Sequence, residues 1–275
     1  MEKGRNLPIF YLKIRDFNNN LDAKVYNTEE QMKKGHVLSI LILLVLWQMA
    51  AVSVGNDILI PFPLETLRCF ASLFAQPMFY QAVGSTILRV TRGFILSLVL
   101  AMVIAVLAER YETFRSLFAP IQIITRTIPN ISYMILALIW LGSEGAVSAV
   151  SFMILFPVFY NAFINCLSSE DPALRDVDLL YPETFLMRLR SRILPVLLIE
   201  ILQTGRTAAG LGLKVGIMAE ILGQVRTGIG RQMNFARLNL DTTGILAWTL
   251  VIILISVLSD RMFSWLLTEK KKEEQ

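Results

Sequence analysis

Histidine is almost absent from this sequence, which holds only His36 among its 275 residues. One histidine cannot supply a histidine-based metal site or the base of a Ser-His-Asp triad. The glycine cluster Gly205-x4-Gly210-x-Gly212 lacks the Gly-Lys-Ser/Thr ending of a phosphate-binding loop, and small residues so spaced let membrane helices pack closely. We therefore expect no catalytic residue, no metal and no cofactor, and thus no enzymatic activity in the chain itself.

Charged residues are also few. They make up 17% of the chain and hydrophobic residues 55%, whereas soluble domains carry about 25% charged residues. A helix that crosses a bilayer needs roughly 20 apolar residues with few charges. Six windows meet this requirement: Val37–Val54, Thr86–Ala108, Ala119–Leu141, Ala146–Leu167, Pro195–Leu222 and Gly244–Leu267. These runs are too long for barrel strands and do not alternate, so they predict an all-α membrane protein with six transmembrane helices.

We expect one transmembrane domain over residues 37–267, an N-terminal helix followed by a five-helix core, between tails at 1–36 and 268–275. With both tails in the cytoplasm, sixteen lysines and arginines of tails and loops lie inside and four outside. This bias predicts an N-in, C-in protein of the cell membrane, and it explains the net charge of +4 without nucleic-acid binding. The polar residues 1–36 are not a signal peptide; they favour either a partly disordered tail or an amphipathic helix on the membrane.

A polar insert, residues 168–193, separates the fourth and fifth windows on the cytoplasmic side. Its arginines alone would suit a solvated linker. Its apolar side chains are too many for a linker in water, and they indicate a helix that packs against a partner. They are Leu179, Leu180, Phe185, Leu186, Met187 and Leu189. We expect Phe185, Leu186 and Leu189 to form the docking face.

Polar residues inside the windows mark a second candidate site. Arg126 and Asn130 flank Pro129 in the third window, where a charge costs a few kcal/mol and a proline frees a backbone carbonyl. Arg126 either lines a solute pathway or extends to the interface, roughly 10 Å away at 1.5 Å per residue. Arg206 and Glu220 in the fifth window either line that pathway or join helices. Glu220 should find its partner on another helix or in a second copy of the chain.

An ordered series of motifs carries a family resemblance. The series is Ile60-Pro61-Phe62-Pro63, Thr86–Phe94, Pro120, Ile128-Pro129, Ile139–Gly142, Gly205-Arg206, Ala219-Glu220 and Gly228-Ile229-Gly230. It resembles the patterns (L/I)PxP, SLxRxxxGF, P…IP…WFG and GLR…AE…GxG of permeases from ATP-binding-cassette (ABC) importers of the nitrate, taurine and sulfonate type. The resemblance runs from about residue 60 to residue 267, and the order of the pieces makes it specific.

The resemblance implies a coupling element. Permeases of this family carry a cytoplasmic motif, E-A-A-x3-G-x9-I-x-L-P, through which they dock an ATPase. Anchored on Pro195, the motif places Asp176 at its glutamate, Pro182 at its glycine and Leu194 at its leucine. Only the Leu194-Pro195 pair and the acidic character of Asp176 are kept. A short helix, a turn and a helix entering the membrane can still make a knob for a groove on a soluble ATPase.

The resemblance also implies the partners. They are a cytoplasmic ABC ATPase dimer, a second permease copy in a homodimer or heterodimer, and an extracytoplasmic solute-binding protein. The solute would be small, such as a sulfonate, a nitrate-like anion or a pyrimidine precursor. A secondary transporter or channel is the alternative, but it predicts inverted repeats and a coupling-ion carboxylate at the membrane midplane, which we do not find in the sequence. An intramembrane enzyme would need a nucleophile and a base, and His36 is poorly placed as that base.

Overall fold

The computed structural model describes residues 38–168 and 184–273, and these residues form helices and turns without a strand. The prediction of an all-α fold is confirmed for this part of the chain. The tail 1–36 and the coupling-motif residues Asp176 and Pro182 lie outside the described residues. The chain divides into two compact units, Met1–Glu65 and Thr66–Gln275.

The first unit contains one described helix, Leu38–Val54, which is apolar but shorter than the helices that follow. It ends at Gly55, whose positive φ of 60° is readily adopted by a residue without Cβ and whose N–H donates to the Ala51 carbonyl at 3.0 Å. The indole N–H of Trp47 donates to the Pro61 carbonyl at 3.1 Å, which ties the helix to the segment after it.

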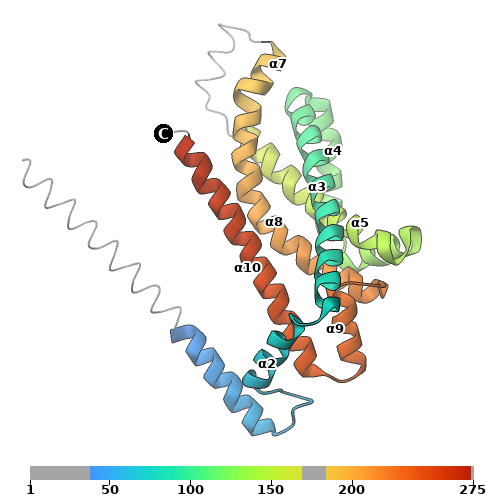
Figure 1. Ribbon diagram of the computed structural model, residues 1–275. Coiled ribbons are helices and arrows are strands. Elements are labelled where there is room, and N and C mark those ends of the chain that lie inside the picture. Colours follow the sequence, from blue (N-terminus) through green and yellow to red (C-terminus); the bar gives the residue numbers. More distant parts are fainter. Residues whose placement is uncertain (1–37, 169–183, 274–275) are drawn as a thin grey trace, which may run out of the picture. The chain divides into compact units, whose positions relative to one another are not determined.

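The second unit is a bundle of long helices (Figure 1). Its elements are α2 (Pro63–Leu73, which begins in the first unit), α3 (Pro77–Arg110), α4 (Glu112–Thr127), α5 (Asn130–Ser168), α7 (Phe185–Arg188), a π-helical turn (Leu189–Ile193), α8 (Leu194–Gly223), α9 (Ile229–Leu238) and α10 (Thr242–Glu273). Among the described residues, α3, α5, the continuous helix from α7 through α8, and α10 are long and apolar enough to cross a membrane. The chain is thus a multi-pass membrane protein.

Helices α3 and α5 meet along a stripe of small residues. Gly93, Ser97, Ala101 and Ala105 recur every four residues on the buried face of α3, so they lie above one another on one side of the helix. A Cβ on Gly93 would come within 2.5 Å of the Ser148 carbonyl oxygen of α5. The close approach lets the phenylalanines of α5 pack over the alanines of α3, and this contact forms the largest apolar core.

The predicted third transmembrane helix, Ala119–Leu141, is wrong as a single element. Helix α4 ends at Thr127, and Ile128 is extended with φ −72° and ψ 128°, because the residue before a proline is driven out of the helical region. Helix α5 then begins at Asn130 and is broken at Gly142, where φ is 67° and ψ is 178°. Two breaks therefore divide the third and fourth predicted windows into three helical pieces.

The helix that contains the predicted fifth window begins before Pro195. The helix starts at Phe185 and continues through Pro195 without a stop. Proline has no N–H for the Ser191 carbonyl, and the turn before it is π-helical, with the Leu194 N–H donating to the Leu189 carbonyl five residues back. In Figure 1, α7 lies at the same end of this unit as the end of α10, whereas α9 lies at the other end.

Candidate functional site

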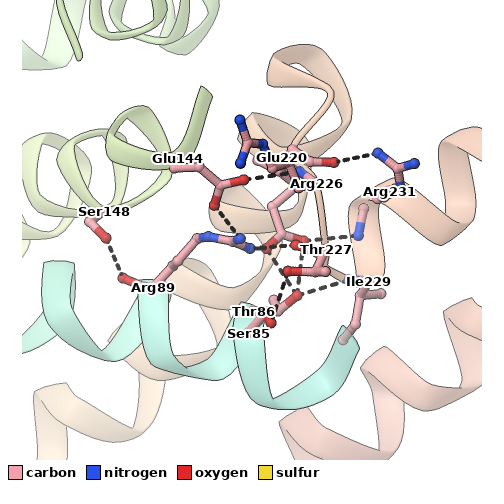
Figure 2. Close-up of polar contacts among 12 residues, drawn as sticks. Ser85, Thr86, Arg89, Glu144, Ser148, Glu220, Arg226, Thr227, Ile229 and Arg231 are labelled. Carbon is pink, nitrogen blue, oxygen red and sulfur yellow. Dashed lines mark hydrogen bonds and ion pairs between the residues drawn. The ribbon is translucent and has the colours of Figure 1, made fainter. Parts of the chain in front are cut away.

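A buried ion pair joins α3 to α8. Arg89 Nη1 donates to Glu220 Oε1 at 2.8 Å, and the Glu220 side chain is completely inaccessible to solvent. Thr86, one helical turn before Arg89, places its hydroxyl 2.9 Å from Oε2 of the same carboxylate. The Gly230 N–H donates to Oε2 at 2.9 Å. Glu220 thus receives donors from α3 and α9, and its charge is matched within the bundle (Figure 2).

Two glycines make room for this carboxylate. A Cβ on Gly228 would lie 2.6 Å from Glu220 Oε2, and one on Gly230 would lie 2.5 Å from the Glu220 Cβ. Gly228 also has a φ of 152°, which side-chain-bearing residues rarely adopt. The loop after α8 can therefore wrap the glutamate only because both positions lack a side chain. The Gly-x-Gly and Ala-Glu motifs of the sequence are two parts of one structure.

A second glutamate, Glu144, binds the same arginine. One of its carboxylate oxygens pairs with Arg89 Nη2, and the other accepts the Arg226 N–H at 2.9 Å. Glu144 follows the break at Gly142 by two residues, so the ion pair links the hinge of α5 to α3 and to the loop after α8 (Figure 2). The Glu144 side chain is 48% exposed, whereas that of Arg89 is 9% exposed. The network therefore runs from the bundle interior to its surface.

The energetics of this network follow from burial. A charge taken out of water costs several kcal/mol unless a partner and hydrogen bonds replace its hydration. Arg89 has two carboxylate partners and also donates to the Thr227 carbonyl at 2.7 Å. Because every contact is to a different segment, the network holds α3, α5, α8 and the α8–α9 loop in one arrangement. Ser148 adds a further tie by donating to the Arg89 carbonyl at 3.0 Å.

The break between α4 and α5 opens a cavity of about 430 Å³. Asn130 and Tyr133 line it from the first turn of α5, and Asn161 lines it from the second half of the same helix. Its walls are Thr125, Ile128, Asn130, Tyr133, Met153, Ile154, Pro157, Val158 and Asn161. Two amides and a phenol among aliphatic walls can offer hydrogen bonds to a small polar solute. We call this cavity the α4–α5 chamber.

The predicted pathway residues are thus not all brought together. Asn130 lines the α4–α5 chamber and Pro129 forms the break beside it, while the side chain of Arg126 lies outside the described part. Arg206 pairs with Asp260 of α10 on a half-exposed surface, with Nη2 2.7 Å from Oδ2. Glu220 is enclosed by its own network. The expectation that Glu220 pairs with another helix is confirmed.

The predicted docking residues differ in how exposed they are. Leu186 and Met187 of α7 are 75% and 60% exposed, and Leu194 and Pro195 are exposed at the start of α8. Leu189 differs from expectation because it packs against the chain's own core of α3, α5 and α8 side chains. The backbone of Phe185 begins α7, while its side chain lies outside the description. The exposed apolar face of this segment is therefore Leu186 and Met187.

Sequence reasoning missed Arg89 and Glu144. Arg89 lies near the start of its apolar window, where an arginine that reaches the interface gives the same pattern. Glu144 falls between the third and fourth windows, so the search for polar residues inside the windows did not include it. The signal was present in Arg89, since it belongs to the same ordered motif series as Glu220. Over the described residues, no group of three or more histidine, cysteine or acidic side chains is placed to hold a metal.

Known proteins of similar sequence are membrane permeases. The chain is 23% identical over 222 residues to the protein of Bacillus subtilis (strain 168) named "Putative aliphatic sulfonates transport permease protein SsuC", and the match covers 80% of each chain. It is 24% identical over 128 residues to the formylaminopyrimidine transport permease protein ThiX of Halalkalibacterium halodurans, covering 46% of this chain and 51% of that protein. No family model matches the chain.

The fold and the comparisons together define a class. The chain is a multi-pass helical membrane protein, and it is similar to permease components of ABC importers. This is the class that the ordered motifs implied. Its relatives are transport proteins rather than enzymes.

Proposed function

We propose that this chain is the membrane-spanning permease subunit of an ABC importer and is driven by a separate ATPase. The observation that carries the proposal is the likeness to a transport permease over 222 residues, in a chain whose sequence holds no phosphate-binding lysine loop of its own. Four long apolar helices supply the membrane part. The energy for uptake then has to come from a partner.

The ATPase docks at the segment that begins with α7. Leu186 and Met187 are large apolar side chains exposed at the start of a 38-residue helix that is long enough to cross the membrane. A soluble partner that binds the exposed apolar end of a rigid helix can transmit its own movement through that helix to the bundle. Asp176 and Pro182, which match the family motif, precede this tip, and Leu194 and Pro195 follow it. Leu189 is half-buried against the chain's own core, so less of its side chain is available to the partner.

The solute passes beside the break between α4 and α5. Asn130, Tyr133 and Asn161 offer hydrogen bonds there. Arg126, which the sequence places in the third window, would favour a negatively charged solute. The relatives are named for sulfonates and for formylaminopyrimidine. A small anionic or heterocyclic solute suits both the chamber and these names. A second copy of the permease completes the pathway, and an extracytoplasmic protein delivers the solute.

Both termini in the cytoplasm remain our proposal for topology, on the charge bias of the tails and loops. A single cysteine at Ser169, with Cys69 and Cys166 replaced by serine, tests it in intact cells. The cysteine should resist an impermeant maleimide and react after the membrane is permeabilised. Labelling from outside would reverse the orientation.

Phosphate release tests the proposed division of labour. The purified chain without partners should release no phosphate from ATP above a detergent blank, and the same chain isolated with its soluble ATPase should do so. Replacing the ATPase lysine that binds phosphate should abolish the activity of the complex. Activity of the partner-free chain would contradict the proposal.

A further inference from the structure

The two glutamates on Arg89 are held very differently. Glu220 has no exposed surface and accepts hydrogen bonds from Thr86, Arg89 and the Gly230 N–H. Glu144 is 48% exposed and accepts only from Arg89 and from the Arg226 N–H. If Glu144 left, Arg89 would still be neutralised by Glu220, so no buried charge would be stranded. Glu144 is therefore the replaceable partner.

The contacts that hold Glu144 form an anion site. Its two oxygens each face a different donor, the guanidinium of Arg89 and the backbone N–H of Arg226. Any small anion with two oxygens at carboxylate-like spacing can accept from the same pair, as both carboxylates and sulfonates do. Arg89 is held in place without help from Glu144, because Glu220 and the Thr227 carbonyl both accept from its Nη1.

Helix α5 is broken at a glycine close to Glu144. Gly142, two residues before it, interrupts α5 at a positive φ of 67°, and no atom lies within 4 Å of the place where its Cβ would be. The break at Gly142 is therefore open on the side where a Cβ would lie. The half of α5 before Gly142 carries Asn130 and Tyr133 of the α4–α5 chamber.

We propose that Glu144 is an internal stand-in for an anionic ligand, and that a small carboxylate or sulfonate displaces it from Arg89 and the Arg226 N–H. Displacement removes the tie between α5 and the rest of the network beside Gly142, so occupancy of the site alters the half of α5 that carries Asn130 and Tyr133. The inference deepens the proposed transport function, on which its role in uptake rests. The binding site itself stands on the geometry of Arg89, Glu144 and Arg226.

Anion binding to the purified full-length chain tests this directly. Methanesulfonate and acetate are titrated by calorimetry into the wild type, Glu144→Gln and Glu144→Ala. With a tethered competitor, the apparent dissociation constant equals the intrinsic constant divided by the fraction of time that the site is free. We expect both variants to bind methanesulfonate at least about tenfold more tightly than the wild type, and the ratio of methanesulfonate to acetate affinity reports which head group the site prefers.

Two controls isolate the effect. Glu112→Gln removes an exposed glutamate from the first turn of α4, away from Arg89, and should leave anion affinity at the wild-type value. Dimethyl sulfone, which has the same shape as methanesulfonate but no charge, should bind no variant. Equal affinity of wild type and both Glu144 variants would overturn the proposal.

A second measurement keeps Glu144 intact, in case its variants fold poorly. Ser143→Cys, with Cys69 and Cys166 replaced by serine, reports exposure of the partly buried residue beside Glu144. Methanesulfonate should raise its alkylation rate several-fold and dimethyl sulfone should not; an unchanged rate would contradict the proposal. If the chain co-purifies with an ATPase but binds no anion, the anion-site inference is contradicted and the proposed transport function is not. If the chain binds the anion but no ATPase partner is found, the anion-site inference is supported and the proposed function is contradicted.

Discussion

Glu220 of α8 accepts a hydrogen bond from Arg89 of α3 at 2.8 Å, across 131 residues of sequence. The contact explains why separate motifs of the chain occur together. One motif supplies Thr86 and Arg89, another supplies Glu220, and a third supplies Gly228 and Gly230 around the carboxylate. A change in any one of them alters the fit of the others. The network therefore stabilises the end of the bundle at which α8 passes into α9.

Removing Glu220 should be severely destabilising. Glu220→Ala leaves the Arg89 guanidinium buried with only half-exposed Glu144 as its anionic partner, and breaking a buried pair in this way costs about 3–5 kcal/mol. We expect a lower thermal midpoint and an aggregated gel-filtration profile for the detergent-solubilised protein.

The Arg206–Asp260 pair is the matched control for this variant. Both of its side chains are half exposed, so removing Asp260 leaves no enclosed charge without a partner, unlike removing Glu220. Asp260→Ala should leave the thermal midpoint close to that of the wild type. If Glu220→Ala and Asp260→Ala lower the thermal midpoint equally, the buried network contributes no more to stability than the half-exposed pair.

Alanine at Gly230 should disrupt the same network by steric conflict. Its Cβ would lie 2.5 Å from the Glu220 Cβ and 2.7 Å from the Ile217 carbonyl oxygen, so either α9 or α8 must move. Gly210 of α8 is the control because nothing lies within 4 Å of its Cβ position. Gly210→Ala should be neutral or stabilising by up to about 1 kcal/mol, from helix propensity. A Gly230→Ala midpoint at or above that of Gly210→Ala would contradict the packing described.

The thiol of Cys69 should react slowly with alkylating reagents at neutral pH. Burial raises its pKa above the ordinary thiol value, and the negative charge of Asp241 raises it further. A raised pKa leaves less thiolate, the reactive form, so the pH at which alkylation reaches half its maximal rate shifts upward. The measurement is iodoacetamide labelling against pH in a Cys166→Ser background.

Two variants give this titration its reference points. Ser72→Cys, made with both native cysteines replaced, puts an exposed thiol on the same helix and should titrate near the ordinary value. Asp241→Asn should move the Cys69 midpoint part of the way down, since it removes the smaller of the two causes. If the alkylation rates of Cys69 and of the Ser72→Cys thiol depend on pH in the same way, the pKa of Cys69 is not raised and the prediction is contradicted.

The sequence predicted the helical membrane fold because long apolar runs have few other solutions in lipid. It did not locate the breaks at Ile128–Pro129 and Gly142, because a 20-residue window averages over a single proline or glycine. The third predicted span failed for this reason. Proline was visible at position 129, but proline is tolerated within transmembrane helices, so its presence alone did not settle whether the helix stopped.

The candidate site was less predictable than the fold. Glu220 was identified as a residue in need of a partner, but its partner Arg89 lies on a helix far away in sequence, and only the folded bundle brings them together. Leu189 was assigned to the docking face by composition, and in the structure its side chain is half-buried against the chain's own core. The π-helical turn at Leu189–Ile193 holds one extra residue per turn compared with an α-helix. It therefore changes which side chains share a face, and no hydropathy pattern reports that change.

The most direct test of the account is the recovery of the soluble ATPase with the tagged chain, for the wild type and for the double variant Leu186→Asp, Met187→Asp. Burial of each apolar side chain against a partner is worth about 1.5–3 kcal/mol, so the double variant should lose the ATPase while keeping a normal gel-filtration profile. Leu238→Asp on α9 is the control, because Leu238 is as exposed as Leu186 but lies at the other end of the bundle. It should recover the ATPase fully, whereas unchanged recovery with the double variant would contradict the proposed coupling.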